Sequence, residues 1–586
     1  MRRLLPVVLS ASVFACSEAS TVLPEPVRTD GGSAVDASVV DASALDAGVQ
    51  EPEDPSNALF DRGVLHHVDV ELDAADWNAL RLQTRTLEST LARPDCLAGP
   101  FESPFTYFEG AVTVDGVRYD RVGIRKKGFL GSLSESRPSL KLKLDEYVPD
   151  LEHLGLSSLT LNNGQQDPSL IRTCLGFDAF RAAGRPSPRC SFAEVTVNGE
   201  SLGPYANVEV VGKRFLRRAF GESEGHLYEG TLSDFRPGWL ATFEQETDKN
   251  VPYDRSDLIA VSDALEAPDS TLLEALSPLV DLDAFFSHWA TEVLVGHWDG
   301  YAGNTNNFFV YRPQGSGKVE LIPWGVDAVY GVGAETPPYS VMAEGMLARR
   351  LYLNPEGRRR YLSTLEGLLS RTFDPRVVLE RIDRDASLIR AAIPAEFRPG
   401  VDAATEALRD DVRGRRARLL AELDAGGAEW DHPLREPICF ELGELEAELD
   451  TTFGTHPAQD PFQTGTGSLT ATVAGVVTRG VVGGSSSGFG VSRDDAGQVV
   501  LILAVTTRDG SIPVLYLVID PDLFSPGVIP IDGTAVRGAL LRIPRPGAEL
   551  EVDSYIWAGA IEIVEGATVL GAPAHVRVRA TLIRPQ

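Results

Sequence analysis

Residues 297–311 read His-Trp-Asp-Gly-Tyr-Ala-Gly-Asn-Thr-Asn-Asn-Phe-Phe-Val-Tyr, and residues 322–331 read Ile-Pro-Trp-Gly-Val-Asp-Ala-Val-Tyr-Gly. In the first stretch, an acid and three amides lie in a glycine-containing loop directly before an apolar strand. In the second, a further carboxylate, Asp327, follows a short apolar strand. This order predicts a hairpin that presents side-chain oxygens at one end. A hairpin cap that binds nothing is the alternative, because Asn and Gly are common turn residues.

The spacing in the first stretch is that of a protein-kinase catalytic loop. Asp299 is followed five residues later by Asn304. In kinases such an Asp orients the acceptor hydroxyl and the Asn binds Mg²⁺, while a second Asp beyond a strand holds the metal on the phosphates. Asp327 lies where this second Asp is expected.

Length and charge limit the classes of protein to which the chain can belong. Its 586 residues suggest about three domains, and 43% of them are hydrophobic, which suffices for folded cores. Lys and Arg number 54 against 84 Asp and Glu, giving a formal net charge of −30. This excess of negative charge argues against a nucleic-acid-binding surface.

Residues 1–16 are typical of an export signal, with a basic start, an apolar run and small residues before Cys16. Cys16 resembles the lipidated cysteine of a bacterial lipobox, and Ser17 after it favours the outer membrane. A short apolar N-terminus on a cytosolic protein is the alternative. Residues 17–57 are rich in Ala, Ser and Asp, which predicts a disordered linker. No later run is long enough to span a bilayer, so we expect acyl chains to be the only anchor.

A row of cations follows a predicted hairpin at residues 105–124. The strand expected at residues 137–144 alternates, so that its basic residues share one face. Backbone N–H groups, a hydroxyl and lysines beside a Gly-Ser loop suit a triphosphate. The candidate phosphate ligands are Arg125, Lys127, Gly128, Ser132, Lys141 and Lys143. An amphipathic edge strand with solvated lysines is the alternative.

Six short motifs occur in an order that resembles the CotH kinase family. They are an Arg-x-Lys-Gly-x-x-x-Ser loop from Arg125, a Pro-Ser-x-Lys-x-Lys strand from Pro138, an Asp-x-Ser-x-x-Arg helix start from Asp167, an Asn-Gly-x-x-x-Gly-x-Tyr-x-x-x-Glu hairpin ending at Glu209, the loop from Asp299 to Phe308, and a Pro-Trp-x-x-Asp-x-x-x-Gly strand end from Pro323. The resemblance covers about residues 64–425. Each motif is weak alone, but their common order is specific.

The resemblance implies an atypical kinase-like α+β domain, with a mixed sheet and helices, that uses ATP with Mg²⁺ or Mn²⁺. The phosphoryl group would go to Ser or Thr of envelope or coat proteins. By matching positions, Asp299 would orient the acceptor hydroxyl, Asn304, Asn307 and Asp327 would hold metal, Lys141 would bind phosphates, and Glu209 would orient Lys141.

One departure from the family pattern concerns the metal. The family usually has Pro-Trp-Asp-x-Asp, whereas this chain has Gly325 at the first acidic position. If the metal carboxylate belongs there, the site is lost; if it belongs at Asp327, the site is whole. The alternative function is a catalytically silent surface or envelope binding protein on the same scaffold, which the scarcity of ATP outside the cell favours.

The composition changes after Gly426 and Gly427. Residues 58–425 are expected to form the kinase-like domain, with helical patterns at 254–298 and 345–425. Residues 436–586 hold most of their apolar residues in strand patterns, such as 499–507 and 512–519, which predicts a β-sandwich or small barrel. Adhesion, scaffolding and simple stabilisation are all open roles for this module.

The remaining four cysteines are Cys96, Cys174, Cys190 and Cys439, which allow three pairings in an oxidising compartment. A Cys174–Cys190 bond would join a helix to a hairpin, and buried thiols are the alternative. No Cys/His spacing in the sequence suggests zinc.

Overall fold

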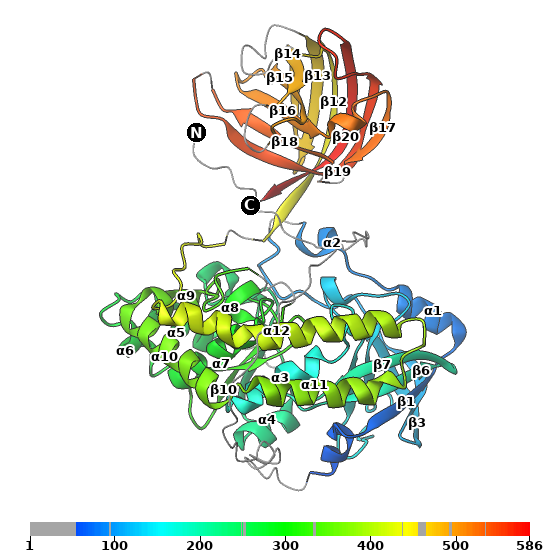
Figure 1. Cartoon of the computed structure of the whole chain (residues 1–586), viewed down its shortest axis with the longest axis vertical. Helices are drawn as coiled ribbons and strands as arrows, with labels where there is room; N and C mark the ends of the chain where they lie inside the picture. The colour runs from blue at the N-terminus through cyan, green and yellow to red at the C-terminus, as the bar shows by residue number, and fades with distance from the viewer. Residues whose placement is uncertain are drawn as a thin grey trace, which may run out of the picture. The chain divides into compact units, whose positions relative to one another are not determined.

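The computed structural model describes residues 54–585, except for 93–94, 248, 250–253, 332–335, 436–437, 455–464, 491–494, 532, 534 and 546. The expected signal peptide, Cys16 and most of the expected linker lie outside the described residues. The described chain is an α+β fold, as predicted, followed by an all-β module (Figure 1).

A closed seven-stranded barrel forms the first part, in the order β1-β2-β3-β4-β5-β7-β6, and the parallel pair β1–β6 closes it. Its strands are β1 (Leu65–Glu71), β2 (Phe108–Val114), β3 (Val117–Lys127), β4 (Ser139–Lys143), β5 (Ser158–Asn162), β6 (Cys190–Val197) and β7 (Glu200–Val208). Because strand side chains alternate, Leu140 and Leu142 of β4 are buried in the barrel core, whereas Lys141 and Lys143 point to the other side.

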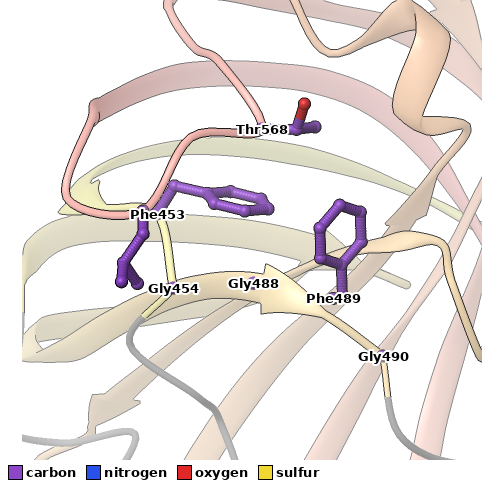
Figure 2. Close-up of a pocket in the computed structure, with 7 residues that line it drawn as sticks. Phe453, Gly454, Gly488, Phe489, Gly490 and Thr568 are labelled. Carbon is purple, nitrogen blue, oxygen red and sulfur yellow. The ribbon is translucent and has the colours of Figure 1, made fainter.

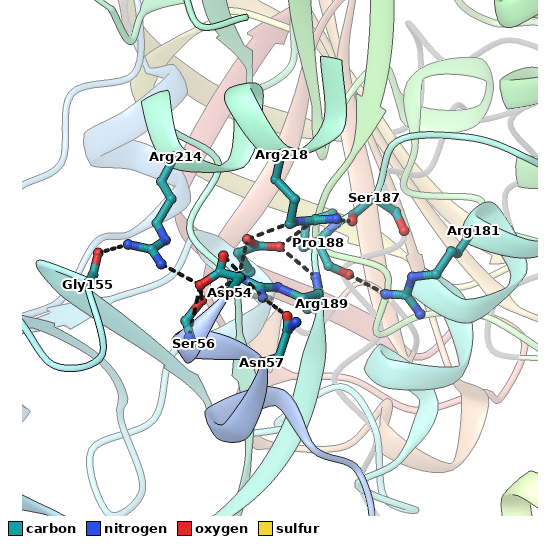
Figure 3. A network of polar contacts seen from close by, with 11 residues as sticks. Asp54, Ser56, Asn57, Gly155, Arg181, Ser187, Pro188, Arg189, Arg214 and Arg218 are labelled. Atoms are coloured by element: carbon teal, nitrogen blue, oxygen red, sulfur yellow. Dashed lines mark hydrogen bonds and ion pairs between the residues drawn. The ribbon is translucent and has the colours of Figure 1, made fainter. Parts of the chain in front are cut away.

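Short helices flank the barrel strands. They are the 3₁₀ helices η2 (Pro55–Phe60) and η3 (Leu130–Ser132) and the α-helices α1 (Ala74–Leu82) and α2 (Leu87–Leu91). The fold therefore includes Asp54–Asn57, which were expected to end the linker. The carboxylate of Asp54 contacts Arg214, and the Arg189 guanidinium donates to the Ser56 hydroxyl at 2.9 Å (Figure 3). These buried contacts order the chain earlier than its composition suggests.

A second, four-stranded sheet has the order β11-β10-β8-β9. Its strands are β8 (Gly225–Gly230), β9 (Glu244–Gln245), β10 (Phe308–Pro313) and β11 (Glu320–Pro323). The helices around it are α3 (Arg172–Ala182), α4 (Lys213–Phe220), η4 (Pro237–Thr242), α5 (Ser256–Leu265), α6 (Leu272–Leu276), α7 (Leu282–Val295), α8 (Tyr301–Asn304), α9 (Met346–Leu353), α10 (Pro355–Arg371), α11 (Pro375–Arg390) and α12 (Arg398–Asp424). The long helices α11 and α12 run side by side (Figure 1). None of the described helices is both long and apolar enough to cross a membrane.

Helix α7 is the centre of the helical core, and it leads into the Asp299 loop. The Asp281 carboxylate caps its start by accepting from the Ala284 N–H at 2.9 Å, and Gly296 ends it at a φ of +70°. Trp289 of α7 stacks on Tyr361 of α10, with ring centroids 3.7 Å apart. This packing fixes the point at which the loop emerges.

The C-terminal module is one curled sheet. Its nine strands have the order β17-β19-β18-β16-β15-β14-β13-β12-β20, and an extra β19–β20 pairing brings the sheet back on itself. They are β12 (Phe440–Thr452), β13 (Thr466–Val473), β14 (Val476–Phe489), β15 (Val499–Thr506), β16 (Ile512–Ile519), β17 (Gly527–Ile531), β18 (Val536–Ile543), β19 (Glu551–Glu565) and β20 (Pro573–Pro585), with η5 (Pro521–Leu523) between β16 and β17. The prediction of an all-β module is confirmed, in the barrel-like form.

Two disulfides join the four cysteines. Cys174 of α3 bonds to Cys190 of β6, as one of the predicted alternatives had it. Cys96 bonds to Cys439, which directly precedes β12. The second bond ties the beginning of the β module to the region after α2.

Candidate functional site

The loop after α7 gathers three amide groups around one carboxylate. Asn304 and Asn306 donate through Nδ2 to Asp299 Oδ1 at 2.7 Å and 3.3 Å. Asn307 donates to Asp299 Oδ2 at 2.7 Å. A carboxylate only accepts hydrogen bonds, so each amide turns its NH₂ group toward Asp299 and its oxygen away. Burial raises the pKa of Asp299, and the three amide hydrogen bonds oppose this rise.

Glu292 of α7 holds this loop in place, although no sequence motif marks this residue. Its carboxylate accepts from the backbone N–H groups of Tyr301 at 2.8 Å and Ala302 at 2.9 Å. Burial favours a higher pKa for Glu292, but His288, His297 and the Ala302 N–H together outweigh burial and lower the pKa. Gly300 is required because an added Cβ would lie 2.3 Å from Glu292 Oε1. The sequence signal that could have marked Glu292 is its i, i+4 spacing from His288 among the apolar residues of α7.

Asp327, after β11, is electrostatically coupled to Asp299. Burial and then the negative charge of Asp299 raise the pKa of Asp327 to about 7, and the positive charge of Lys127 acts in the opposite direction. The pairing of Phe308 with Pro323 places the loop before β10, which carries Asp299, and the loop after β11, which carries Asp327, at the same end of the β10–β11 hairpin.

The Gly325 position has no room for the acid that the family pattern carries there. Gly325 has a φ of +49°, and an added Cβ would lie 2.4 Å from Asn307 Oδ1. The Trp324 N–H donates to the Asn307 carbonyl at 3.1 Å, which fixes the two strand ends against each other. Asp327 is thus the acid of the family's motif that this chain retains.

Three of the predicted cations form a group beside this site. Arg125 of β3 and Lys141 of β4 are cross-strand neighbours. Lys127 donates to Asn162 Oδ1 at 2.7 Å and lies 5.3 Å from the Trp324 ring centroid. Burial lowers the pKa of Lys127 to about 8, and burial followed by the charge of Arg125 lowers the pKa of Lys141.

Glu229 of β8 is a buried carboxylate whose charge acts on both Lys127 and Lys141, and Glu246 acts on Lys141 as well. Burial and then the charges of Glu246 and Glu244 raise the pKa of Glu229 to about 7, while Lys127 and Lys141 oppose the rise. Oxygens of Glu229, Glu244 and Glu246 lie within 4.8 Å of one another, so these three side chains could also hold a cation. Neither hydrophobic periodicity nor motif spacing marked Glu229.

The other predicted phosphate ligands have different surroundings. Gly128 has a φ of +125°, and an added Cβ would lie 2.5 Å from the hydroxyl of Ser132, so this turn is close-packed around the hydroxyl. Lys143 pairs with Glu146 at 2.7 Å, and the Arg125 guanidinium lies over the Tyr107 ring at 5.0 Å. Lys143 is therefore drawn to a local partner.

Two predicted roles differ from the contacts observed. Glu209 does not orient Lys141: its buried carboxylate is held by Arg189 and Arg218, each at 2.7 Å, because it ends β7 beside α4 rather than beside β4 (Figure 3 shows both arginines). The Asn304 oxygen, expected to bind metal, accepts from the Arg435 guanidinium at 2.6 Å. Of the three residues expected to bind metal, Asn307 and Asp327 remain as candidates.

A separate pocket lies in the C-terminal module (Figure 2). It is lined by Phe453, Gly454, Gly488, Phe489, Gly490, Thr568 and Leu570. The rings of Phe453 and Phe489 pack edge to face, with centroids 5.2 Å apart. None of the predicted site residues contributes to this lining.

The described site thus belongs to an α+β protein that buries two coupled carboxylates beside a group of cations. The family described as CotH kinase protein matches residues 124–413, so this part of the chain is a CotH-like domain. Inner spore coat protein H of Bacillus subtilis (strain 168) is 27% identical over 235 residues, which are 37% of this chain and 64% of that relative, less than two thirds of its length.

Two further proteins match this chain over fewer residues or at lower sequence identity. The inner spore coat protein H-like protein of Bacillus subtilis (strain 168) is 41% identical over 64 residues, 10% of this chain and 21% of that relative. The crystal structure of the Helicobacter pylori proinflammatory kinase CtkA aligns with 49% of this chain and 95% of that chain, at 8% identity and a TM-score of 0.25. That structural likeness is too weak to bear on the site.

Proposed function

We propose that this chain is a metal-dependent kinase that transfers the γ-phosphoryl group of ATP to Ser or Thr of proteins. The observation that carries the proposal is the Asp299 carboxylate, held by three amide groups at the end of the β10–β11 hairpin, where Lys127 lies against Trp324. Phosphoryl transfer needs mostly positioning and charge stabilisation, and this arrangement offers acids for a cation next to bases for phosphates. The match to the CotH kinase family supports the same conclusion.

The donor set fits Mg²⁺ or Mn²⁺, because both prefer oxygen ligands such as those of Asp327 and Asn307. The cation would neutralise charge on the phosphates. Asp299 accepts three amide N–H groups, which leaves one of its roughly four acceptor positions for the hydroxyl of the substrate. In this role it orients the hydroxyl and accepts its proton.

The basic residues would hold the phosphates. Lys127 and Lys141 supply point charges from two adjacent strands, and the turn at Gly128 brings backbone and the Ser132 hydroxyl near them. Glu229 would take the orienting role that sequence matching gave to Glu209, because its charge acts on both lysines.

The proposed setting is the cell envelope. Cys16 would carry the lipid and Ser17 would direct the protein to the outer membrane, so that the substrate is an envelope or coat protein. The names of the matched Bacillus subtilis relatives, inner spore coat protein H and its H-like protein, are compatible with a coat-protein role.

Transfer from labelled ATP tests the proposal. The full chain is incubated with Mn²⁺ or Mg²⁺ and a generic acidic protein acceptor, and autophosphorylation is followed in parallel. Incorporation that is lost in both Asp299→Ala and Asp327→Asn supports the site. Incorporation unaffected by Asp299→Ala would remove the assigned role of that residue.

A catalytically silent envelope binding protein is the second candidate. Gly325 in place of an acid favours it, because the site then has one carboxylate fewer than the family pattern. This candidate predicts nucleotide binding, measured by calorimetry, without any turnover of labelled ATP.

A further inference from the structure

Arg435 contacts the Asp299 loop, although it lies outside residues 124–413, the part of the chain that matches the family. It lies in the α12–β12 segment, which we define as residues 425–435. Its Nη1 donates to Asn304 Oδ1 at 2.6 Å, and its Nη2 donates to the Thr305 hydroxyl at 2.5 Å and to the Asn304 carbonyl at 3.2 Å. One guanidinium thus binds the oxygen that kinase spacing assigns to a cation.

Several contacts hold Arg435 in this position. The Arg236 guanidinium donates to the Arg435 carbonyl at 2.7 Å, and Arg236 is itself paired with the buried Asp234 at 2.7 Å. The Arg435 guanidinium lies 5.4 Å from the Trp239 ring centroid. The segment is also tied by Arg349, which donates to the His432 carbonyl at 2.7 Å. The contact with Asn304 is therefore built into the fold.

The positive charge of Arg435 excludes a metal cation from the amide oxygen of Asn304. Asn304 is fixed between Asp299, which can only accept, and Arg435, which can only donate, so its amide has one orientation. A divalent cation on the same oxygen would lie within a few ångströms of the guanidinium, where two positive charges repel strongly. Occupation of Asn304 Oδ1 by Arg435 and by metal is mutually exclusive.

We propose that the α12–β12 segment is an autoinhibitory element in which Arg435 occupies a cation position on Asn304 and must leave before the proposed kinase site takes its full metal complement. The inference rests on the proposed function, since it concerns the same site. By thermodynamic linkage, docking of the α12–β12 segment weakens cation binding by the same factor by which a bound cation weakens docking of the segment.

Mn²⁺ binding to the full chain, measured by calorimetry with and without ATP, tests this competition. We expect Arg435→Gln to bind Mn²⁺ about tenfold more tightly than the unchanged protein, a difference of about 1.4 kcal/mol. Arg349→Gln is the matched control, because it loosens the same segment but leaves the guanidinium on Asn304, and we expect no change from it. Equal or weaker binding by Arg435→Gln overturns the inference, as does equal tightening by Arg349→Gln.

Hydrogen exchange of residues 425–435 in the unchanged protein gives a readout that needs no variant to fold. Added Mn²⁺ with ATP should speed exchange in this segment, and Asp327→Asn should abolish the response. Exchange that stays constant or slows on Mn²⁺ addition contradicts the inference. If the protein binds Mn²⁺ but Arg435→Gln does not change the affinity, only this inference is removed. If neither the unchanged protein nor any variant binds Mn²⁺, the proposed function is removed as well.

Discussion

Two buried clusters of charged residues in the same domain shift the pKa values of their carboxylates in opposite directions. Around Glu209, two arginines surround one carboxylate, and although burial alone would raise its pKa, their charges lower it. Around Asp327, burial and a second acid prevail, and the pKa rises to about 7. A structural cluster satisfies its charges with protein partners, whereas the proposed kinase site leaves carboxylates short of positive charge. That deficit is what a cation and a bound substrate would remedy.

Removal of Asp299 is the change with the largest expected effect. Asp299→Ala should lower phosphoryl transfer about a thousandfold, in the range measured for the loss of a positioned general base. Labelled-ATP incorporation measures the rate, and circular dichroism confirms that the fold persists. A loss below tenfold would mean that the amide-lined carboxylate is as structural as Glu209.

Disruption of the cluster around Glu209 should reduce the stability of the fold and not the kinase activity. Glu209→Gln replaces the buried carboxylate that Arg189 and Arg218 share with a neutral amide, and we expect the free energy of unfolding to fall by about 3 kcal/mol. Urea unfolding measures this quantity. Glu406→Gln, at an exposed ion pair, is the control and should not change stability measurably. A similar result for both variants would contradict the structural role of Glu209.

Replacement of Lys141 and replacement of Lys143 should change the KM for ATP to different extents, because the two side chains have different partners. Lys141→Met should raise the KM for ATP about tenfold, because it removes one charge-assisted contact with phosphate, worth about 1.5 kcal/mol. Lys143→Met is matched in position and chemistry, but Lys143 pairs with Glu146 and should matter less. Initial rates at varied ATP distinguish the two. An equal effect of both changes would show that the whole face of β4 binds nucleotide.

The smallest expected effect is an increase in stability. The folded-state pKa of Asp327 is raised from 3.8 to about 7, so the folded protein binds a proton more tightly than the unfolded chain, and stability falls as the pH rises from about 4 to about 7. Without metal, Asp327→Asn should therefore raise Tm by about 2 °C near pH 8 and leave it unchanged near pH 3, where the Asp327 carboxyl is protonated in both states. Thermal scans in a chelating buffer measure it; a lower Tm near pH 8 would mean that Asp327 is a stabilising charge.

Local patterns in the sequence predicted most of the elements. The alternation in β4 indicated that Lys141 and Lys143 share a face, and the strands of the C-terminal module followed from period-two patterns and turns. The Cys174–Cys190 pair was one of several possibilities, because pairing depends on distances that spacing does not give. The boundary after Asn57 was placed too late, since the contacts of Asp54 and Ser56 come from distant arginines.

The sequence by itself determined the α+β fold class, the all-β module and the loop with Asp299, because periodicity, turn residues and the order of short motifs are local properties. Only the tertiary structure decided which charges meet. It placed Glu229 rather than Glu209 near the lysines, and it brought Arg435 to Asn304. The physical reason is that a charge acts through space, and strands and segments far apart along the chain supply the partners.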